Sequence, residues 1–421
     1  MILRLAIASL LNRRLTAGLT VLSIALSVAL LLAVERVREQ ARTSFADTVS
    51  GTDLIVGART SPVHLLLFSV FRIGNPTNTM RWESHEWLMR RPEVAWTIPL
   101  SLGDSHRGYR VIGTSSSYFQ RYRYASGRSL VFAQGGAFTQ AQDAVLGAEV
   151  ARRLGYSVGS KVVLAHGAGD VSFALHDERP FRISGVLAPT GTPVDRAVHV
   201  PLGGLDALHA STLGTDDDDP LAAALRSREA QATGSTAPAS LSAVLVGLHK
   251  RGQALGLQRA VNEFDGEALT AILPGATLME VWEIAGVAER ALSAVSWMVV
   301  AVGLAGMLVA LLTGLAERRR EMAVLRSVGA RPSHVFALML CEAAMLTAAG
   351  IVAGAGTLQV LVASGRDWLE RQLGLTVSAG WFSGHEIQLM LLVSAAGTII
   401  GLVPAWRIYR QSLADGMIVR L

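Results

Sequence analysis

Arginine side chains gather in one short segment between two long uncharged runs of the chain. The segment, residues 314–340, reads GLAERRREMAVLRSVGARPSHVFALML and includes Arg318, Arg319, Arg320 and Arg326. Guanidinium groups bind phosphates through paired hydrogen bonds, so a basic loop of this kind can contact lipid phosphates. Such loops also fix the orientation of the membrane spans beside them, which is the ordinary role of a basic loop.

The spacing within this segment predicts a short amphipathic helix over 317–331. Glu317 with Arg320, and Arg318 with Glu321, stand three residues apart, a separation that supports a solvent-exposed helix. The apolar positions repeat every third residue and form a narrow stripe opposite these charges: Met322, Leu325 and Val328.

The residues that follow predict a turn and then a new helix. Gly329 can adopt the left-handed conformation that closes a helix, and Pro332 cannot continue one. Pro332 is well suited to begin the next helix because its missing N–H is not needed there. The predicted helix over 317–331 is therefore joined at both ends to apolar segments, and a rigid connection would make it a lever.

The composition places the chain among membrane proteins. It has 421 residues, of which 51% are hydrophobic and only 17% charged, whereas soluble proteins carry about 25% charged residues. Four apolar runs are long enough to cross a hydrocarbon core of about 30 Å, and we expect spans at 15–34, 291–316, 332–363 and 387–406. The first run is longer than the apolar core of a cleaved signal peptide, about 7–15 residues, so we interpret it as a retained span.

The distribution of arginine predicts the orientation. Arg13 and Arg14, the 317–331 segment and the 407–421 tail are basic flanks that should face the cytoplasm together with the 1–14 segment. The 35–290 region and a short loop at 364–386 then lie on the far side. Arg36 and Arg38 follow the first span there, and long translocated domains tolerate such charges. The net charge of +5 reflects this topology, so nucleic acid is not an expected partner.

The 35–290 region predicts an α+β domain that lacks disulfides, because Cys341 is the only cysteine. Short apolar runs separated by turn residues predict a strand near Leu54–Val56, a strand-rich insertion at about 105–205 and a helix closed by Gly155. A further strand at SAVLVGL and a helix from Lys250 to Phe264 complete the pattern.

Three features of the external region leave alternatives open. The aspartates Asp216–Asp219 near His209 can bind a metal or remain solvated, and the absence of a known ligand spacing favours the second. Nine of the ten histidines lie outside by this topology, yet no pair has the spacing of a helical zinc site. The apolar run His64–Phe71 can form a lipid-contacting surface or, more commonly, core.

The order of residues in the charged segment closely resembles the signature of the MacB/FtsX-like (LolC/LolE-type) ABC transporter permeases. The matching positions are Glu321, Leu325, Arg326, Gly329, Ala330, Glu342 and Ala343. The resemblance implies that the helix is a coupling helix that docks on a cytoplasmic ABC ATPase. Its expected contact residues are Arg318, Arg319, Arg320, Glu321, Leu325, Arg326, Gly329 and Ala330.

The resemblance extends over nearly the whole chain. The start looks like the amphipathic N-terminal helix and first span of the family, and stretches such as YRVIGTSSSYFQRYRYASGRSL look like its external domain. The tail GLVPAWRIYRQSLADGMIVRL is also similar. Two stretches depart from the family pattern: DLIVGARTSPVHLLLFSVFRIGNPTNTM, which is longer and more apolar, and the segment around Asp216–Asp219.

The resemblance implies an α-helical membrane protein with four transmembrane helices and a large α+β MacB-like periplasmic domain, located in a bacterial inner membrane. A dimer of permeases would work with two ATPase subunits and transmit movement to the external domains. The resemblance does not choose among cargoes; the apolar run His64–Phe71 makes lipoprotein or lipid release or export our preferred task. A periplasmic or outer-membrane partner is also expected in this family. The sequence has no G-x-x-x-x-G-K-[ST] motif, so we expect ATP and magnesium to bind the partner ATPase and no catalytic or metal site here.

Glycine spacing adds weak support for close helix packing in the spans. Gly350 with Gly354, and Gly397 with Gly401, have the small-xxx-small spacing of packed membrane helices and allow close contact with another helix or a second copy. Glu342 is a candidate functional residue, because placing a carboxylate within a membrane costs free energy. We expect it at the lipid headgroup level or paired with a nearby arginine.

Two other classes of function stay open. A sensor or scaffold would bind an external ligand, for instance a metal, through its His- and Asp-containing domain. An enzyme is less favoured because neither a nucleophile elbow nor an H-E-x-x-H motif is present.

Overall fold

Two compact units make up the chain, and the computed structural model describes residues 2–48, 50–125, 127–166, 174–175, 180–212, 240–317, 331–373 and 380–409. The helical unit comprises Met1–Ala41 with Ala285–Leu421, and the mixed unit comprises Arg42–Ile284. Two helices, α2 and α10, begin in one unit and end in the other.

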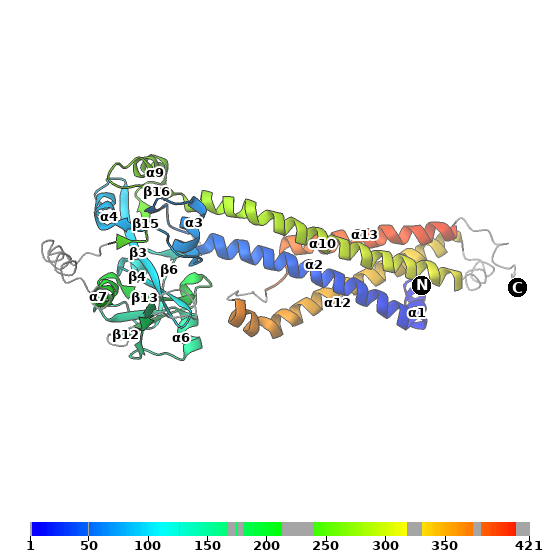
Figure 1. Ribbon diagram of the computed structural model, residues 1–421. Coiled ribbons are helices and arrows are strands. Elements are labelled where there is room, and N and C mark those ends of the chain that lie inside the picture. Colours follow the sequence, from blue (N-terminus) through cyan, green and yellow to red (C-terminus); the bar gives the residue numbers. More distant parts are fainter. Residues whose placement is uncertain are drawn as a thin grey trace. The chain divides into compact units, whose positions relative to one another are not determined.

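The helical unit is built from five helices among the described residues. They are α1 (Ile2–Asn12), α2 (Arg14–Thr48), α10 (Pro274–Glu317), α12 (Pro332–Leu373) and α13 (Gly384–Tyr409). Four of them, all except α1, are long and apolar enough to cross a membrane. Their membrane-crossing parts run alongside one another in Figure 1, and α12 begins at Pro332 as the sequence predicts.

The faces of α2 show how the helical unit divides its apolar side chains. One face packs in a core with α10 and α12, where Ile24, Val28 and Leu32 are buried. On the other face, Leu15 is 75% exposed and Leu19 is 60% exposed. A helix that is apolar on all sides and exposes leucine on one side is typical of a membrane span in contact with lipid.

Glycines bring α12 close to both of its neighbours. A Cβ added at Gly350 would lie 2.5 Å from Cγ2 of Ile24 in α2, and one at Gly354 would lie 2.5 Å from the Ala25 carbonyl oxygen. On α13, a Cβ at Gly397 would lie 2.3 Å from Oγ1 of Thr347 in α12. Because lipid supplies no hydrophobic drive between helices, this close fit of backbones provides much of the attraction.

Gly401 makes the corresponding contact one turn further along α13, where an added Cβ would lie 2.4 Å from Cβ of Ala343. The four glycines of the sequence pattern therefore face helices of the same chain. Gly350 and Gly354 face α2, while Gly397 and Gly401 face α12.

The mixed unit centres on one sheet, which has 12 strands among the described residues. Its main path runs β16-β1-β15-β3-β4-β13-β8-β12-β7. The bounds are β1 (Leu54–Ala58), β3 (Val94–His106), β4 (Tyr109–Thr114), β7 (Phe132–Gly135), β8 (Asp143–Leu146), β12 (Phe181–Leu187), β13 (Ala197–Pro201), β15 (Ala243–Leu248) and β16 (Leu269–Ile272). The pairs β13–β4 and β12–β8 are parallel, and the other pairs are antiparallel.

Smaller elements complete the mixed unit. The short strands are β2 (Met80–Arg81), β5 (Arg123–Tyr124), β6 (Arg128–Ser129), β9 (Lys161–Val162), β10 (Ala165–His166), β11 (Ala174–Leu175) and β14 (Ser240–Leu241). The helices are α3 (Pro62–Leu66), α4 (Trp82–Met89), α5 (Ser117–Arg121), α6 (Ala148–Leu154), α7 (Leu202–Thr212) and α9 (Ala254–Asn262), with single turns η1 (Leu67–Phe71), η2 (Pro193–Arg196) and η3 (Arg251–Gln253).

Several local expectations are confirmed. The strand near Leu54–Val56 is β1, the SAVLVGL strand is β15, and α6 ends at Gly155, whose φ of 68° is left-handed. The strand-rich 105–205 insertion does contain β4 to β13, but it is continuous with the rest of the sheet, since β4 pairs with β3 through Leu100 opposite Thr114. A four-helix membrane protein with an α+β domain is the observed fold class.

The apolar run His64–Phe71 corrects one of the hypotheses. It forms α3 and the π-helical turn η1, and Leu65, Leu66 and Phe68 are buried in the main core of the mixed unit. A lipid-contacting surface on this run is therefore wrong, and its greater apolar character is explained by core packing. Arg72 ends the turn with a left-handed φ of 62°.

Two histidines of the mixed unit are buried in apolar surroundings. His199 is fully buried against the rings of Tyr118 and Phe119, with centroid distances of 4.9 and 5.8 Å. Burial, with a smaller contribution from the positive charge of Arg72, lowers the pKa of His199 to about 3, and burial lowers the pKa of His85 to about 4. Both rings are therefore neutral in the folded state at neutral pH.

Replacing Gly354 by leucine should destabilise the helical unit by about 1–3 kcal/mol, since the larger side chain meets the α2 backbone at Ala25. The measurement is thermal unfolding of the full chain in detergent. Gly356→Leu is the matched control, because Gly356 is exposed and nothing lies within 4 Å of its Cβ position. An equal loss of stability in both variants would contradict close packing at Gly354.

Acid should destabilise the mixed unit between about pH 6.5 and pH 3. His199 binds a proton below pH 6.5 when unfolded, but only near its lowered pKa of about 3 when folded, so falling pH favours unfolding. Each such proton contributes about 1.4 kcal/mol per pH unit. Denaturant unfolding at several pH values should show a smaller acid loss for His199→Phe than for wild type. His249→Phe, which replaces an exposed ring, should keep the wild-type loss.

Candidate functional site

The charged segment joins the end of α10 at Glu317 to the start of α12 at Pro332. Residues 318–330 lie outside the described residues, and they include every expected ATPase contact from Arg318, Arg319, Arg320 and Glu321 to Leu325, Arg326, Gly329 and Ala330. The structure therefore describes the two helices that hold this segment.

The first turn of α12 is closed by a reciprocal pair of hydrogen bonds. The Arg331 N–H donates to Nδ1 of His334 at 3.2 Å, and the His334 N–H donates to the Arg331 carbonyl oxygen at 2.9 Å. A side chain three residues into the helix thus satisfies an amide at the helix start, as in a capping box. This geometry fixes the direction in which the chain enters α12.

The helix α1 packs against the same end of the helical unit. Ala6 of α1 is fully buried in a small apolar cluster with Val335 and Met339 of α12 and Ala405 of α13. The start of α12 is therefore held from two sides by elements from the opposite ends of the sequence. Such packing makes a firm base for the 317–331 segment.

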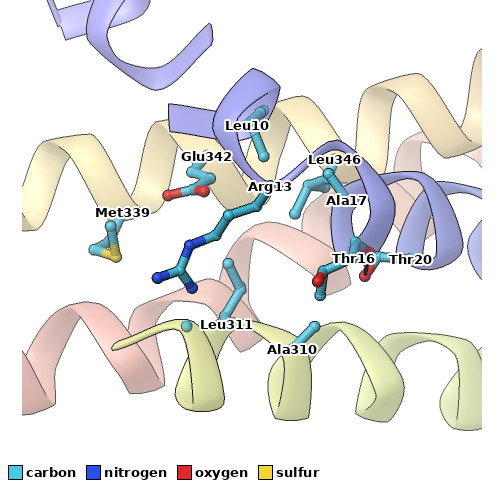
Figure 2. A pocket seen from close by; sticks show the side chains of 11 residues that line it. Leu10, Arg13, Thr16, Ala17, Thr20, Ala310, Leu311, Met339, Glu342 and Leu346 are labelled. Atoms are coloured by element: carbon cyan, nitrogen blue, oxygen red, sulfur yellow. Dashed lines mark hydrogen bonds between the residues drawn. The ribbon is translucent and has the colours of Figure 1, made fainter. Parts of the chain in front are cut away.

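Next to this base, a small pocket contains Glu342, the carboxylate that the sequence singled out. Figure 2 shows the Arg13 and Glu342 side chains in this pocket, Arg13 from the junction of α1 and α2 and Glu342 from α12. The cavity volume is about 30 Å³, enough for one or two water molecules. Its lining residues are Leu10, Arg13, Thr16, Ala17, Thr20, Ala310, Leu311, Gly314, Met339, Glu342 and Leu346.

The contacts of Glu342 indicate a structural link between helices. Only 4% of the residue is exposed, and its Oε1 accepts a hydrogen bond from Oγ of Ser9 in α1 at 3.3 Å. The Arg13 guanidinium lies against α10, because a Cβ at Gly314 would be 2.5 Å from Nη1. A buried carboxylate requires hydrogen bonds or an opposite charge nearby, and this pocket provides both types of group. The hydrogen bond between Ser9 and Glu342 thus links α1 to α12 near the charged segment.

The sequence reasoning missed a second charged cluster at the other end of these helices. Arg36 of α2 was expected to be a tolerated external charge, but it is 9% exposed and forms a two-point ion pair with Glu386 of α13. Ser383-Gly-His-Glu386, placed directly before the predicted span at 387–406, matches a capping-box pattern and was the available signal. Nothing in the sequence points to Arg36 as its partner.

In the mixed unit, the ends of α2 and α10 meet in an aromatic cluster. The Phe45 ring of α2 lies 4.4 Å from the Phe71 ring and 5.5 Å from the Trp282 ring of α10, measured between centroids. Arg42 lies over Trp282 at 5.6 Å. The buried Tyr122 hydroxyl donates to the Thr48 carbonyl oxygen at the last turn of α2, at 2.9 Å. Both helix ends are thus anchored in the core that holds the sheet.

The part of the chain that the structure describes offers no support for a metal site. Within it, no group of three or more His, Cys, Asp or Glu side chains is arranged to hold a metal ion. The Asp216–Asp219 segment lies outside the described residues. The histidines His85 and His199 are core residues, as their burial shows.

Comparison with known protein families agrees with this architecture. The MacB-like periplasmic core domain matches residues 17–239, just over half of the chain, and the FtsX-like permease C-terminal domain matches residues 293–413. No curated protein sequence matches the chain significantly.

Two solved structures are similar at low identity. The periplasmic region of MacB from Actinobacillus actinomycetemcomitans is 11% identical, with a TM-score of 0.34 over 56% of this chain and 97% of that one. The extracellular domain of the noncanonic ABC-type transporter YknZ from Gram-positive bacteria is 14% identical, with a TM-score of 0.30 over 52% and 98%. The family assignment rests on the two domain matches, which together cover most of the sequence. The chain belongs to the MacB/FtsX-like family of ABC transporter permeases.

Proposed function

We propose that this permease works with a separate cytoplasmic ATPase and transmits the motion of ATP hydrolysis to its periplasmic domain. The observation that carries the proposal is the position of the charged segment, which connects the ends of α10 and α12 directly. The other end of α10 is anchored in the mixed unit through Trp282. One continuous helix of 44 residues therefore links the proposed ATPase contact to the periplasmic domain.

The proposed assembly contains two copies of this chain and two ATPase subunits in a bacterial inner membrane, with both chain termini in the cytoplasm. ATP and magnesium would bind to the ATPase, and the chemistry of hydrolysis would take place there. The role of this chain would be mechanical, with Arg318 to Arg326 meeting the ATPase surface and Leu325 filling an apolar depression in it. Arginines give such an interface specificity through paired hydrogen bonds with carboxylates.

Within this role we propose release of a lipid or a lipoprotein from the membrane as the task. The core that α2, α10 and α12 share consists of apolar side chains, among them Leu32, Leu304, Met307 and Leu346. Such an interior favours a cargo that stays on the periplasmic side over a polar solute that passes between these helices. An acylated cargo would be lifted from the outer surface of the membrane by the moving domain.

Leu325→Asp should abolish ATPase docking, because it places a charge in the apolar stripe of the predicted coupling helix. Copurification of the full chain with its partner ATPase should fall at least tenfold, and stimulated hydrolysis should be lost. Leu255→Asp is the matched control, since it makes the same change at a 69% exposed site on α9. Normal docking and hydrolysis in Leu325→Asp would contradict the coupling role.

ATP should drive release of an acylated cargo from vesicles that contain the complete complex. The probe is a fluorescent lipopeptide in the vesicle membrane, with a soluble acceptor outside, and the measurement is its transfer with and without ATP. We expect ATP-dependent transfer that Leu325→Asp abolishes. ATP-dependent docking and hydrolysis without transfer of the lipopeptide would contradict lipoprotein release while leaving the coupling role intact.

A further inference from the structure

A buried set of polar groups ties three of the four spans together at one end of the helical unit. Nε and Nη2 of Arg36 in α2 donate to the two carboxylate oxygens of Glu386 in α13, at 2.9 and 3.1 Å. Nη1 of the same arginine donates to Oε1 of Gln359 in α12 at 3.4 Å. The guanidinium therefore contacts both of the neighbouring helices at once, and we call this set the clamp.

Additional contacts hold the clamp in one geometry. Oε2 of Glu386 accepts a hydrogen bond from the Ser383 N–H at 2.8 Å, and Oγ of Ser383 accepts one from the Glu386 N–H at 3.2 Å. The Phe382 ring lies 5.4 Å from the guanidinium carbon of Arg36. A buried ion pair of this kind resists separation, since removing either partner leaves an uncompensated charge.

The backbones of the same three helices also fit closely. Gly350 and Gly354 of α12 face α2, and Gly397 and Gly401 of α13 face α12, each with too little space for an added Cβ. The clamp and these glycines together make α2, α12 and α13 one block. Sliding one helix past another would separate the ion pair and lift the glycines out of their contacts.

The remaining span, α10, is joined differently. Oγ of Ser27 in α2 donates to the Val299 carbonyl oxygen at 3.1 Å, and a Cβ at Gly303 would lie 2.7 Å from the same Oγ. Oγ1 of Thr347 in α12 donates to Sδ of Met307 at 3.5 Å. Between α10 and α13 lies an open cavity of about 320 Å³. Its lining is apolar throughout: Trp297, Val300, Ala301, Leu304, Ala305, Leu308, Ala396 and Ile400.

Three of the lining residues are alanines, Ala301, Ala305 and Ala396, so α10 and α13 have room to come closer and to gain contacts with each other. No polar side chain of the lining would have to lose a partner if α10 moved across this cavity. Motion of α10 toward α13 has to displace lipid from the cavity and to shift Met307, which is buried in the core shared with α2 and α12.

We propose that α10 pivots about its contact with Ser27 and closes the cavity against α13, while the clamp keeps α2, α12 and α13 moving as one block. The proposal rests on the proposed coupling to an ATPase, which supplies the force at Glu317. It assigns Arg36 and Glu386 a positioning role and makes α10 the span that carries the movement.

Distances between spin labels in the complete complex test this directly, in lipid nanodiscs and in a Cys341→Ser background. Cysteines for labelling are placed at lipid-facing sites, Val302 with Ile399 for α10 to α13, and Val360 with Leu391 for α12 to α13. On trapping the ATP state, the first distance should change and the second should stay constant. Singly labelled chains identify the distances that join two copies.

Two variants, each with a control, test the cavity and the clamp. The double variant Ala301→Leu with Ala305→Leu fills the cavity. It should remove most of the change in the α10 to α13 distance while ATPase docking persists. The control Val309→Leu lies on the lipid-facing side and should leave this distance change intact. Glu386→Gln leaves the Arg36 charge buried and should broaden the α12 to α13 distances. Gln388→Asn alters an exposed amide two residues further along α13 and should not.

The outcomes separate this inference from the proposed function. If the ATPase docks and its hydrolysis is stimulated, yet both distances change together or neither changes, the pivot of α10 is wrong and the coupling role stands. If no ATPase docks, the coupling role is wrong and the pivot has no source of force. A filled cavity that leaves the α10 distance change unaltered would also overturn the pivot.

Discussion

Close backbone contact along α12 is the constraint on which the helical unit depends. Helices in lipid gain little from burying apolar side chains against one another, so shape and a few polar contacts must hold them together. In this chain α2 packs against Gly350 and Gly354 of α12. The α13 glycines Gly397 and Gly401 pack against Thr347 and Ala343 of α12. The position of α12 between its two neighbours then brings Glu342 and Gln359 to the polar groups at its two ends.

The buried charged side chains of the described spans that bridge to other helices each have a polar partner. Glu342 accepts a hydrogen bond from Ser9 beside Arg13, and Glu386 receives two from Arg36. Both clusters connect helices that are far apart in sequence, and both lie in α12 or next to it. Charges in such surroundings are poor sources of net stability, but they resist slippage because separating them leaves a charge unpaired.

The mixed unit holds the ends of two long helices in its core. Its sheet is continuous, so the segment that α2 leads into and the segment that precedes α10 belong to adjacent strands, β1 and β16. Aromatic side chains, with Phe45 and Trp282 at their centre, fill the space where the two helices meet the sheet. The burial of His64–Phe71 extends this core, which explains the long apolar stretch of the sequence.

The sequence by itself determined the class of protein, the four spans, many of the local elements and the family. Those properties follow from runs of apolar residues, from helix signals such as Gly155 and Pro332, and from short motifs, all of which are local. Only the tertiary structure decided that Arg36 pairs with Glu386, 350 residues away, that the strand-rich insertion shares one sheet, and that His64–Phe71 is core. Contacts of this kind depend on which surfaces meet after folding. The spacing of residues along the chain does not specify which surfaces these are.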